Sequence, residues 1–325
     1  APGRRHLQSS LLSSSKGAIT PVLRFSSSNN SGITTDSTVQ LRSGARMPFI
    51  GIGTFTGTRY SAKQPKGAMG QAVETFIRNG GRMIDCAQNY LNEDEIGDAI
   101  QSCISSGHVK REDLFVSSKL NNPYHKQEHI LPALERTLYD LNLDYLDMYL
   151  VHWPTAFVYV PLPDKTQGRG LPLEYEPDEC SKVTGVRFAD AHWDRTNTIP
   201  PHLQRGVTIH ETWAGMEEIK KKGLARHVGV CNFNVQLLHE LCMNASEIPD
   251  VLQCESHPFL QQWGLLKYCN HMRIQFQSYS PLGYGVFRGK GEEAIIGHSV
   301  LSAIGAKYGK SSAQVALRWS VERNV

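Results

Sequence analysis

Residues 80–90 read GGRMIDCAQNY, and the fold prediction depends on the pattern that they hold. The two glycines end an amphipathic helix predicted over residues 68–81, and a short apolar strand follows at residues 82–86. An acid, Asp85, stands near the end of this strand, and a phenol, Tyr90, comes five residues later. An ionised carboxylate is costly to bury unless a partner neutralises it. The pattern therefore predicts a buried strand whose acid is paired with a group from elsewhere in the chain.

The rest of the chain repeats this alternation of short apolar strands and amphipathic helices. Strands are predicted at residues 48–54, 82–86, 114–119, 146–153, 225–232, 251–256 and 273–280. Helices are predicted at residues 68–81, 93–105, 130–141, 235–244 and 264–272. Such alternation is typical of a parallel sheet covered by helices. A doubly wound sheet usually has a glycine-rich dinucleotide fingerprint after its first strand, and Gly51, Gly53 and Gly57 do not have that spacing. The predicted fold class is therefore α/β, a (β/α)8 TIM barrel, with an N-terminal β-hairpin at residues 38–48.

Two segments lie outside this repeat. Residues 1–35 are basic and rich in serine, with no Asp or Glu, which is typical of an organelle transit peptide. The alternative is a disordered tail without a targeting role. We expect residues 36–325 to form the barrel domain, interrupted by a long loop at about 155–206 that is rich in Pro, Gly and charge. The first segment predicts a location in the mitochondrial matrix, with the cytoplasm as the alternative.

Composition argues against several classes of function. The net charge of +3 is small for 325 residues, and basic residues are interspersed with acidic ones, so nucleic acid is not an expected partner. Seven cysteines form no CxxC pair and cannot all be paired, which favours free thiols and no metal site. No apolar run approaches the roughly 18 to 20 residues that span a bilayer, so no membrane span is expected.

Polar residues at the strand ends suggest the chemistry. The C-terminal ends of all strands in a (β/α)8 barrel meet at one face, where Asp85, Lys119 and His152 are predicted to lie with Tyr90. Each has an ordinary structural explanation, such as an Asp–Lys bridge, loop packing or a hydrogen-bonded core histidine. Together they form a plausible proton donor: a lysine cation lowers the pKa of a neighbouring phenol, and a carboxylate holds the lysine in place. An imidazole can orient a substrate carbonyl.

These residues lie in segments that resemble the aldo-keto reductase superfamily. The matching segments, in order, are MPFIGIGTF, GGRMIDCAQNYLNEDEIGDAI, LFVSSKL, YLVHWP, ARHVGVCNFN, LQCESHPFL, SYSPLG and KYGKSSAQVALRW, within residues 47–319. The resemblance implies reduction of an aldehyde or ketone with a hydride from NADPH. It assigns Tyr90 as the acid, Lys119 and Asp85 as the groups that tune it, and His152 as the group that orients the substrate.

The resemblance also implies residue roles around the cofactor and substrate. Asn232 and Gln253 hold the nicotinamide carboxamide, and Tyr279 stacks on the ring. The turn from Ser280 through Leu282 to Gly283 embraces the pyrophosphate, while Thr54 and Asp85 lie near the nicotinamide ribose. Phe55 and Trp153 stand where the family places aromatic walls of the substrate pocket, and ordinary packing at the barrel mouth explains them equally well.

The chain departs from the family pattern in four places. Cys231 and Leu252 stand where the family often has Ser and Asn, which predicts a weaker hydrogen bond to the cofactor. The resemblance also implies an eighth strand after Val325, so seven barrel strands are expected from residues 1–325. The preference for NADPH over NADH is implied by the resemblance alone. The loop at about 155–206 is expected to act as a lid or as a docking surface for proteins. The alternative function is therefore that of a non-catalytic or moonlighting subunit with this fold in a larger assembly, which the N-terminal segment would place in mitochondria.

Overall fold

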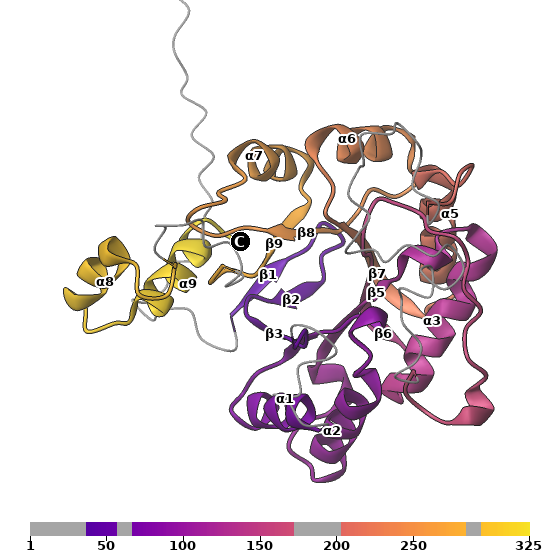
Figure 1. Ribbon diagram of the computed structural model, residues 1–325, viewed down its shortest axis with the longest axis horizontal. Coiled ribbons are helices and arrows are strands. Elements are labelled where there is room, and N and C mark those ends of the chain that lie inside the picture. The colour runs from indigo at the N-terminus through magenta and orange to yellow at the C-terminus, as the bar shows by residue number, and fades with distance from the viewer. Residues whose placement is uncertain (1–36, 57–66, 172–202, 284–293) are drawn as a thin grey trace, which may run out of the picture. The chain divides into compact units, whose positions relative to one another are not determined.

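The computed structural model describes residues 37–56, 67–171, 203–283 and 294–325. The targeting prediction for residues 1–35 and most of the predicted loop thus lie outside the described residues. Thr35–Val325 form one compact unit. Its strands are surrounded by helices (Figure 1).

Seven parallel strands form a nearly closed barrel, which confirms the predicted fold class. They are β3 (Gly51–Gly53), β4 (Met83–Asp85), β5 (Phe115–Leu120), β6 (Leu146–Val151), β7 (Ala225–Cys231), β8 (Val251–Glu255) and β9 (Gln275–Tyr279). Each strand pairs with the next one along the chain, so β3 and β9 are the two edges. A separate antiparallel pair, β1 (Thr38–Gln40) and β2 (Arg46–Pro48), confirms the predicted N-terminal hairpin.

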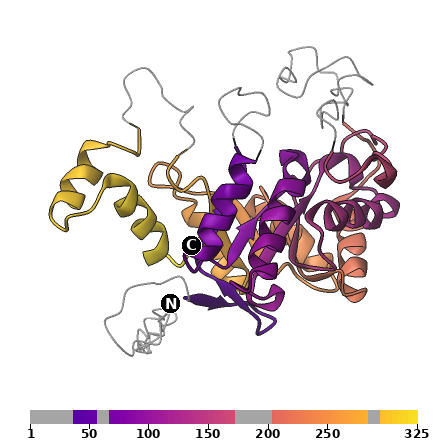
Figure 2. The same ribbon diagram turned by 90° about the horizontal axis from the view of Figure 1, so that it is seen from below.

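Helices connect the strands and lie outside the barrel (Figure 2). They are α1 (Ala68–Arg78), α2 (Glu93–Ser105), α3 (Gln127–Leu141), α5 (Ile209–Lys221), α6 (Val235–Asn244) and α7 (Trp263–Met272). After β9 come α8 (Ser299–Ala306) and α9 (Ser312–Glu322), which pack on each other. Short 3-10 turns include η1 (Gln88–Tyr90), η2 (Arg111–Asp113), η3 (Asn122–Tyr124) and η4 (Lys165–Gln167).

Helix α5 lies outside the set predicted from the sequence. The side chain of Thr208 accepts a hydrogen bond from the backbone N–H of Glu211, which satisfies a donor that the helix itself leaves free. The helix then buries Trp213, Met216 and Ile219, which recur every three residues on one face. The helix directly follows a segment rich in Pro, Gly and charge, which by its composition reads as a loop.

Side-chain alternation along the strands decides which residues face the barrel interior. Successive residues of a strand point to opposite faces, so Phe115, Ser117 and Lys119 share one face of β5 while Ser118 points the other way. Phe115 packs with Met83, Met148, Leu150, Cys231, Val251 and the hairpin residues Leu41 and Met47 in one apolar cluster. This interior cluster closes the N-terminal end of the barrel beneath the polar strand ends.

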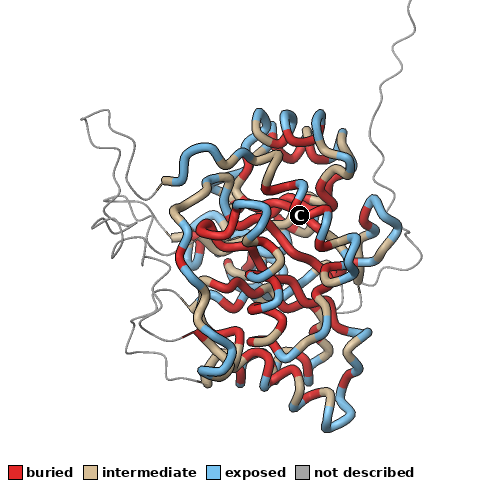
Figure 3. The backbone as a smooth tube through the Cα atoms, turned by 90° about the vertical axis from the view of Figure 1, so that its right-hand side faces the viewer, coloured by how far each residue is buried: buried red, intermediate tan, exposed pale blue. Residues whose placement is uncertain are grey.

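A second, larger core lies between the strands and the helices. Its members include Ile84 on β4, Ile100 on α2, Leu134 on α3 and Val230 on β7, all fully buried. Figure 3 shows the consequence: the barrel strands are mostly buried, and exposed residues gather on the outer turns of the helices. Each such side chain contributes about 1.5–3 kcal/mol on burial. The two cores together hold the strand ends in fixed positions.

The first part of the predicted loop is fastened to helix α3. The guanidinium of Arg136 is paired with Asp140 and donates to the backbone carbonyls of Pro163 (3.2 Å), Gly168 (3.3 Å) and Gly170 (2.8 Å). Arg169 in turn donates to carbonyls at the end of α3 and pairs with Asp98 of α2. Residues 163–170, here called the strap, are therefore bound to two helices.

The six cysteines in the described residues are free thiols and all are buried. They are Cys86, Cys103, Cys231, Cys242, Cys254 and Cys269. Burial raises the pKa of each thiol, so these groups are neutral at physiological pH.

Candidate active site

Lys119 and Asp85 meet in the barrel interior, so the carboxylate at the end of its strand has the partner that its burial requires. Lys119 Nζ donates to Asp85 Oδ2 at 2.8 Å and to the backbone carbonyl of Cys86 at 2.8 Å. The hydroxyl of Ser117 donates to Asp85 Oδ1 at 2.8 Å. Burial lowers the pKa of the Lys119 ammonium, but its negative and hydrogen-bonding surroundings, with Asp85 foremost, together raise it by more, so the net pKa lies above its usual value. Lys119 is therefore a permanent buried cation.

Tyr90 lies beside this ion pair. Lys119 Nζ is 5.1 Å from the centroid of the Tyr90 ring, and the ring centroids of Phe55 and His152 are 5.0 and 5.8 Å away. Burial raises the pKa of the phenol, and Lys119 opposes that rise. The expected lowering effect of the lysine is therefore present, but desolvation outweighs it and the net pKa of the phenol lies above its usual value.

His152 is a buried, neutral imidazole. Burial lowers its pKa well below the usual value, and the cation of Lys119 and the neighbouring His125 add to that effect. Its backbone carbonyl accepts a hydrogen bond of 2.8 Å from Asn232 Nδ2. A neutral imidazole retains one ring N–H, which can donate to a carbonyl oxygen.

The two residues that are predicted to hold the carboxamide lie at the ends of β7 and β8. Asn232 has a φ of 62°, a conformation that asparagine tolerates better than most residues, and its Oδ1 accepts a hydrogen bond of 2.8 Å from the Tyr279 hydroxyl. Cys231 Sγ lies 3.8 Å from Gln253 Oε1. Gln253 Nε2 is buried and has no hydrogen-bond partner among the described residues. A buried amide donor without a partner suits a ligand carbonyl or amide oxygen.

The remaining predicted cofactor residues lie in a backbone turn after β9 and directly after β3. The N–H of Gly283 donates to the Ser280 carbonyl at 2.9 Å, with Leu282 between them, and Ser280 has a φ of 48°. Such a conformation is strained for serine and is typical of functional turns. Thr54 follows β3, and both its N–H and its hydroxyl donate to the backbone carbonyl of Asp85.

Two aromatic side chains remain exposed around the tyrosine. Phe55 is 49% and Trp153 is 41% exposed, and Trp153 stacks on His152 with ring centroids 6.5 Å apart. Large aromatic side chains are usually more buried than this. They lie next to Tyr90 and His152, and their role as walls of a substrate pocket stays a prediction.

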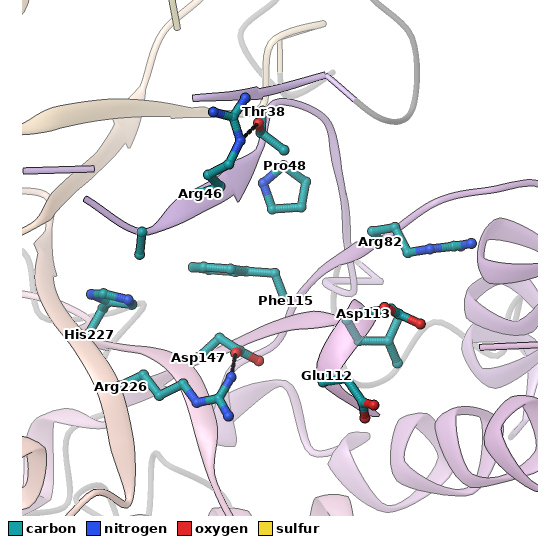
Figure 4. A pocket seen from close by; sticks show the side chains of 12 residues that line it. Thr38, Arg46, Pro48, Arg82, Glu112, Asp113, Phe115, Asp147, Arg226 and His227 are labelled. Atoms are coloured by element: carbon teal, nitrogen blue, oxygen red, sulfur yellow. Dashed lines mark hydrogen bonds and ion pairs between the residues drawn. The ribbon is translucent and has the colours of Figure 1, made fainter. Parts of the chain in front are cut away.

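A hollow of about 600 Å³ lies at the opposite end of the barrel. Figure 4 shows its lining, with Arg46 and Pro48 of the hairpin on one side, Asp147 on the other and the Phe115 ring between them. Its buried acid, Asp147, is already paired with Arg111 at 2.9 Å and Arg226 at 3.3 Å. The N-terminal face of such barrels generally serves stability, and none of the predicted site residues lines this hollow.

The structure adds residues that the sequence analysis did not single out. Ser117 binds Asp85, and its place two residues before Lys119 on the same strand face was a usable signal. Glu93 is buried on the first turn of α2, where an acid ordinarily faces solvent, so no sequence signal marked it. Among the described residues, no group of three or more His, Cys, Asp or Glu side chains is placed to hold a metal ion. No helix in the described ranges is long and apolar enough to cross a membrane.

The barrel and its Tyr–Lys–Asp–His site have the features of an oxidoreductase that acts on carbonyl groups. The profile of the Aldo/keto reductase family matches residues 49–325. The chain therefore belongs to the aldo-keto reductase family, whose members reduce carbonyl groups with NAD(P)H.

Known proteins agree with this assignment. Aldo-keto reductase family 1 member A1 of Mus musculus is 37% identical over 90% of this chain and 79% of its own length. The NAD(P)H-dependent D-xylose reductase I,II of Candida tropicalis is 34% identical over 90% of this chain and 82% of its own. The crystal structure of a Bombyx mori aldo-keto reductase in complex with NADP has a TM-score of 0.69 and 31% identity, covering 88% of this chain and 80% of that one.

Proposed function

We propose that this chain is an NADP(H)-dependent carbonyl reductase that converts an aldehyde or ketone to an alcohol, with Tyr90 as the proton donor. The observation that carries the proposal is the buried Lys119–Asp85 ion pair beside the Tyr90 ring, with a neutral His152 on another side of that ring. A buried ion pair is weak evidence for a purely stabilising role, and a cation beside a phenol favours release of the phenol's proton.

Each side chain has one task in this proposal. Burial keeps the Tyr90 phenol protonated at neutral pH, so it has a proton to give to the carbonyl oxygen. The Lys119 ammonium stabilises the phenolate that remains, and Asp85 keeps the ammonium charged and in place. The neutral imidazole of His152 donates to the substrate oxygen and orients it.

The residues at the strand ends fit a nicotinamide cofactor. NADPH, when bound, supplies the hydride to the carbonyl carbon. Asn232 and the unpaired Nε2 of Gln253 would hold its carboxamide, and Tyr279 would stack on the ring after releasing its hydrogen bond to Asn232. Cys231 would offer a thiol, a weaker hydrogen-bonding group than a hydroxyl.

The Ser280–Gly283 turn would receive the pyrophosphate, with Thr54 and Asp85 near the ribose. NADP(H) is proposed as the cofactor because the Bombyx mori relative was solved with NADP.

The test combines cofactor binding with turnover. Titration with NADPH should quench tryptophan fluorescence saturably, and Tyr279→Ala should weaken that binding. Tyr90→Phe should lower turnover of a test aldehyde by about 10²-fold or more while binding of NADPH changes little. Tyr308→Phe, a change at a side chain that is 73% exposed, is the matched control and should leave both unchanged. Normal turnover by Tyr90→Phe would remove Tyr90 from the mechanism. Absence of NADPH binding would favour the non-catalytic alternative.

Localisation and protein partners are separate proposals. Targeting to mitochondria rests on the composition of residues 1–35. Fusion of these residues to a fluorescent protein tests it, and a diffuse cytosolic signal would contradict it. Docking of proteins on the N-terminal segment or on the 155–206 loop is tested by deleting each segment and measuring complex formation in extracts.

A further inference from the structure

Glu93 is a buried acid that the proposed chemistry does not use. It is the first residue of α2, three residues after Tyr90, and its exposed fraction is 3%. An acid in the first turn of a helix usually stays in solvent, where it interacts favourably with the helix dipole at little cost. Burial of this carboxyl therefore needs a structural or functional reason.

The carboxyl of Glu93 is held by the strand that carries the catalytic lysine. The hydroxyl of Ser118 donates to Glu93 Oε1 at 2.6 Å, and Ser118 directly precedes Lys119. Because neighbouring strand residues point to opposite faces, Ser118 faces the helix layer while Lys119 faces the barrel interior. One hydrogen bond thus joins the segment of the proton donor to the strand of its cation.

Two further buried side chains fasten the same short segment. Gln88 Nε2 donates to the carbonyl of Ala133 on α3 at 3.4 Å, and Asn92 Nδ2 donates to the carbonyl of Thr54 after β3 at 2.8 Å. Residues 88–93 are thus tied to three different elements. The tie through Glu93 is the one that reaches the strand of Lys119.

We propose that Glu93 is a positioning residue for Tyr90, and that its hydrogen bond with Ser118 sets the distance and angle between the phenol and Lys119. This inference rests on the proposed function of Tyr90. Displacement of a catalytic group by about 1 Å can cost on the order of 100-fold in rate. A hydrogen bond only three residues from the phenol is well placed to prevent such a shift.

Glu93 carries out this role as a neutral acid. Burial, and to a lesser extent the charge of Asp140, raise its pKa, while the hydroxyls of Ser118 and Thr137 and the Lys119 cation oppose the rise, and the net pKa is about 8. The other titratable groups that sense it are Tyr149 on β6 and Cys86 after β4, both neutral at pH 7. Its Oε2 is buried without a hydrogen-bond partner among the described residues, which suits an uncharged carboxyl. Glutamine, which is neutral and of the same shape, should therefore replace it well at pH 7.

Three variants test the proposal: Glu93→Leu, Glu93→Gln and Ser118→Ala. We expect Glu93→Leu to lower kcat about 10- to 100-fold with little change in NADPH affinity, and Ser118→Ala to lower it less. Glu93→Gln can still accept the Ser118 hydrogen bond and should keep most of the rate at pH 7. Normal kcat in folded Glu93→Leu and in Ser118→Ala would overturn the proposal.

A spectroscopic readout separates this inference from the proposed function. The protein is labelled with 3-fluorotyrosine, and the Tyr90 fluorine resonance is assigned by its loss in Tyr90→Phe. We expect this resonance to shift in Glu93→Leu and to stay in place in Glu93→Gln. A shift in a protein that reduces no carbonyl would leave the positioning role intact and overturn the proposed function. An unchanged resonance in both Glu93→Leu and Ser118→Ala would overturn the positioning role, whatever the turnover.

Discussion

Replacement of Arg136 by methionine should cost much of the stability of the fold. Its side chain is 2% exposed and that of its partner Asp140 is 1% exposed, and Arg136 Nε donates to Asp140 Oδ2 at 2.9 Å. Methionine fills similar space but leaves the Asp140 carboxylate without its Arg136 partner, at a site where burial already raises the pKa of Asp140. It also deprives the carbonyls of Pro163, Gly168 and Gly170 of a charged donor. Removal of one partner of a buried ion pair costs about 3–5 kcal/mol.

The chain contains a matched control for this change. Arg318 and Glu322 on α9 have the same spacing of four residues, but their side chains are 58% and 59% exposed. An exposed pair of this kind contributes about 0.3–0.5 kcal/mol. Urea unfolding of Arg136→Met and Arg318→Met should therefore show a difference of about 3 kcal/mol. The double variant Arg136→Met with Asp140→Leu should recover a large part of the loss, because it removes the unpaired charge.

Equal unfolding free energies for Arg136→Met and Arg318→Met would refute the reasoning, because burial would then have no bearing on the strength of the pair. Limited proteolysis adds a local readout. Loss of Arg136 should free the strap and speed its cleavage, since three of the carbonyls that fix it would lose their donor.

Three other changes test the fold and the site. Glu93 has a folded-state pKa of about 8 against a usual 4.5, so stability should fall as pH rises through that range, by up to about 1.4 kcal/mol per pH unit. Glu93→Gln should flatten this slope in urea unfolding measured from pH 5 to 9, and parallel slopes would contradict the assignment. Gly229→Ala would place a Cβ 2.4 Å from the Val251 carbonyl oxygen and should cost about 1–3 kcal/mol in thermal unfolding, whereas Gly264→Ala meets open space and should cost nothing. Lys119→Met should abolish carbonyl reduction and destabilise the fold. Adding Asp85→Asn should restore stability but not turnover, because it removes the unpaired charge. A normal pH–rate profile for Lys119→Met would exclude a role of Lys119 in tuning the phenol.

The barrel was predictable because its signal is repeated along the chain. Seven apolar strands and most helices follow from periodicity alone, and the strand ends bring Asp85, Lys119 and His152 together without any knowledge of side-chain contacts. Tyr90 could be placed next to them because it follows a strand closely. Roles at the cofactor site came from family resemblance, and they remain predictions.

Other features depend on three-dimensional packing that spacing does not reveal. The net rise in the Tyr90 pKa results from burial, which a neighbouring lysine in the sequence pattern does not predict. The inward turn of Glu93 depends on Ser118, a residue 25 positions away. The attachment of the strap to Arg136 was hidden because a Pro- and Gly-rich segment reads as a loop whether or not it is bound to a helix.

The buried thiols can be used to follow how the native fold opens. Only an exposed thiolate reacts readily with an alkylating reagent. All six cysteines in the described residues are buried, and burial keeps their thiols protonated. Cys86 directly follows β4 and the others lie on α2, β7, α6, β8 and α7, so each reports on a different part of the barrel. The order in which they become alkylated in mild denaturant, measured by mass spectrometry, would therefore give the order in which parts of the barrel unfold.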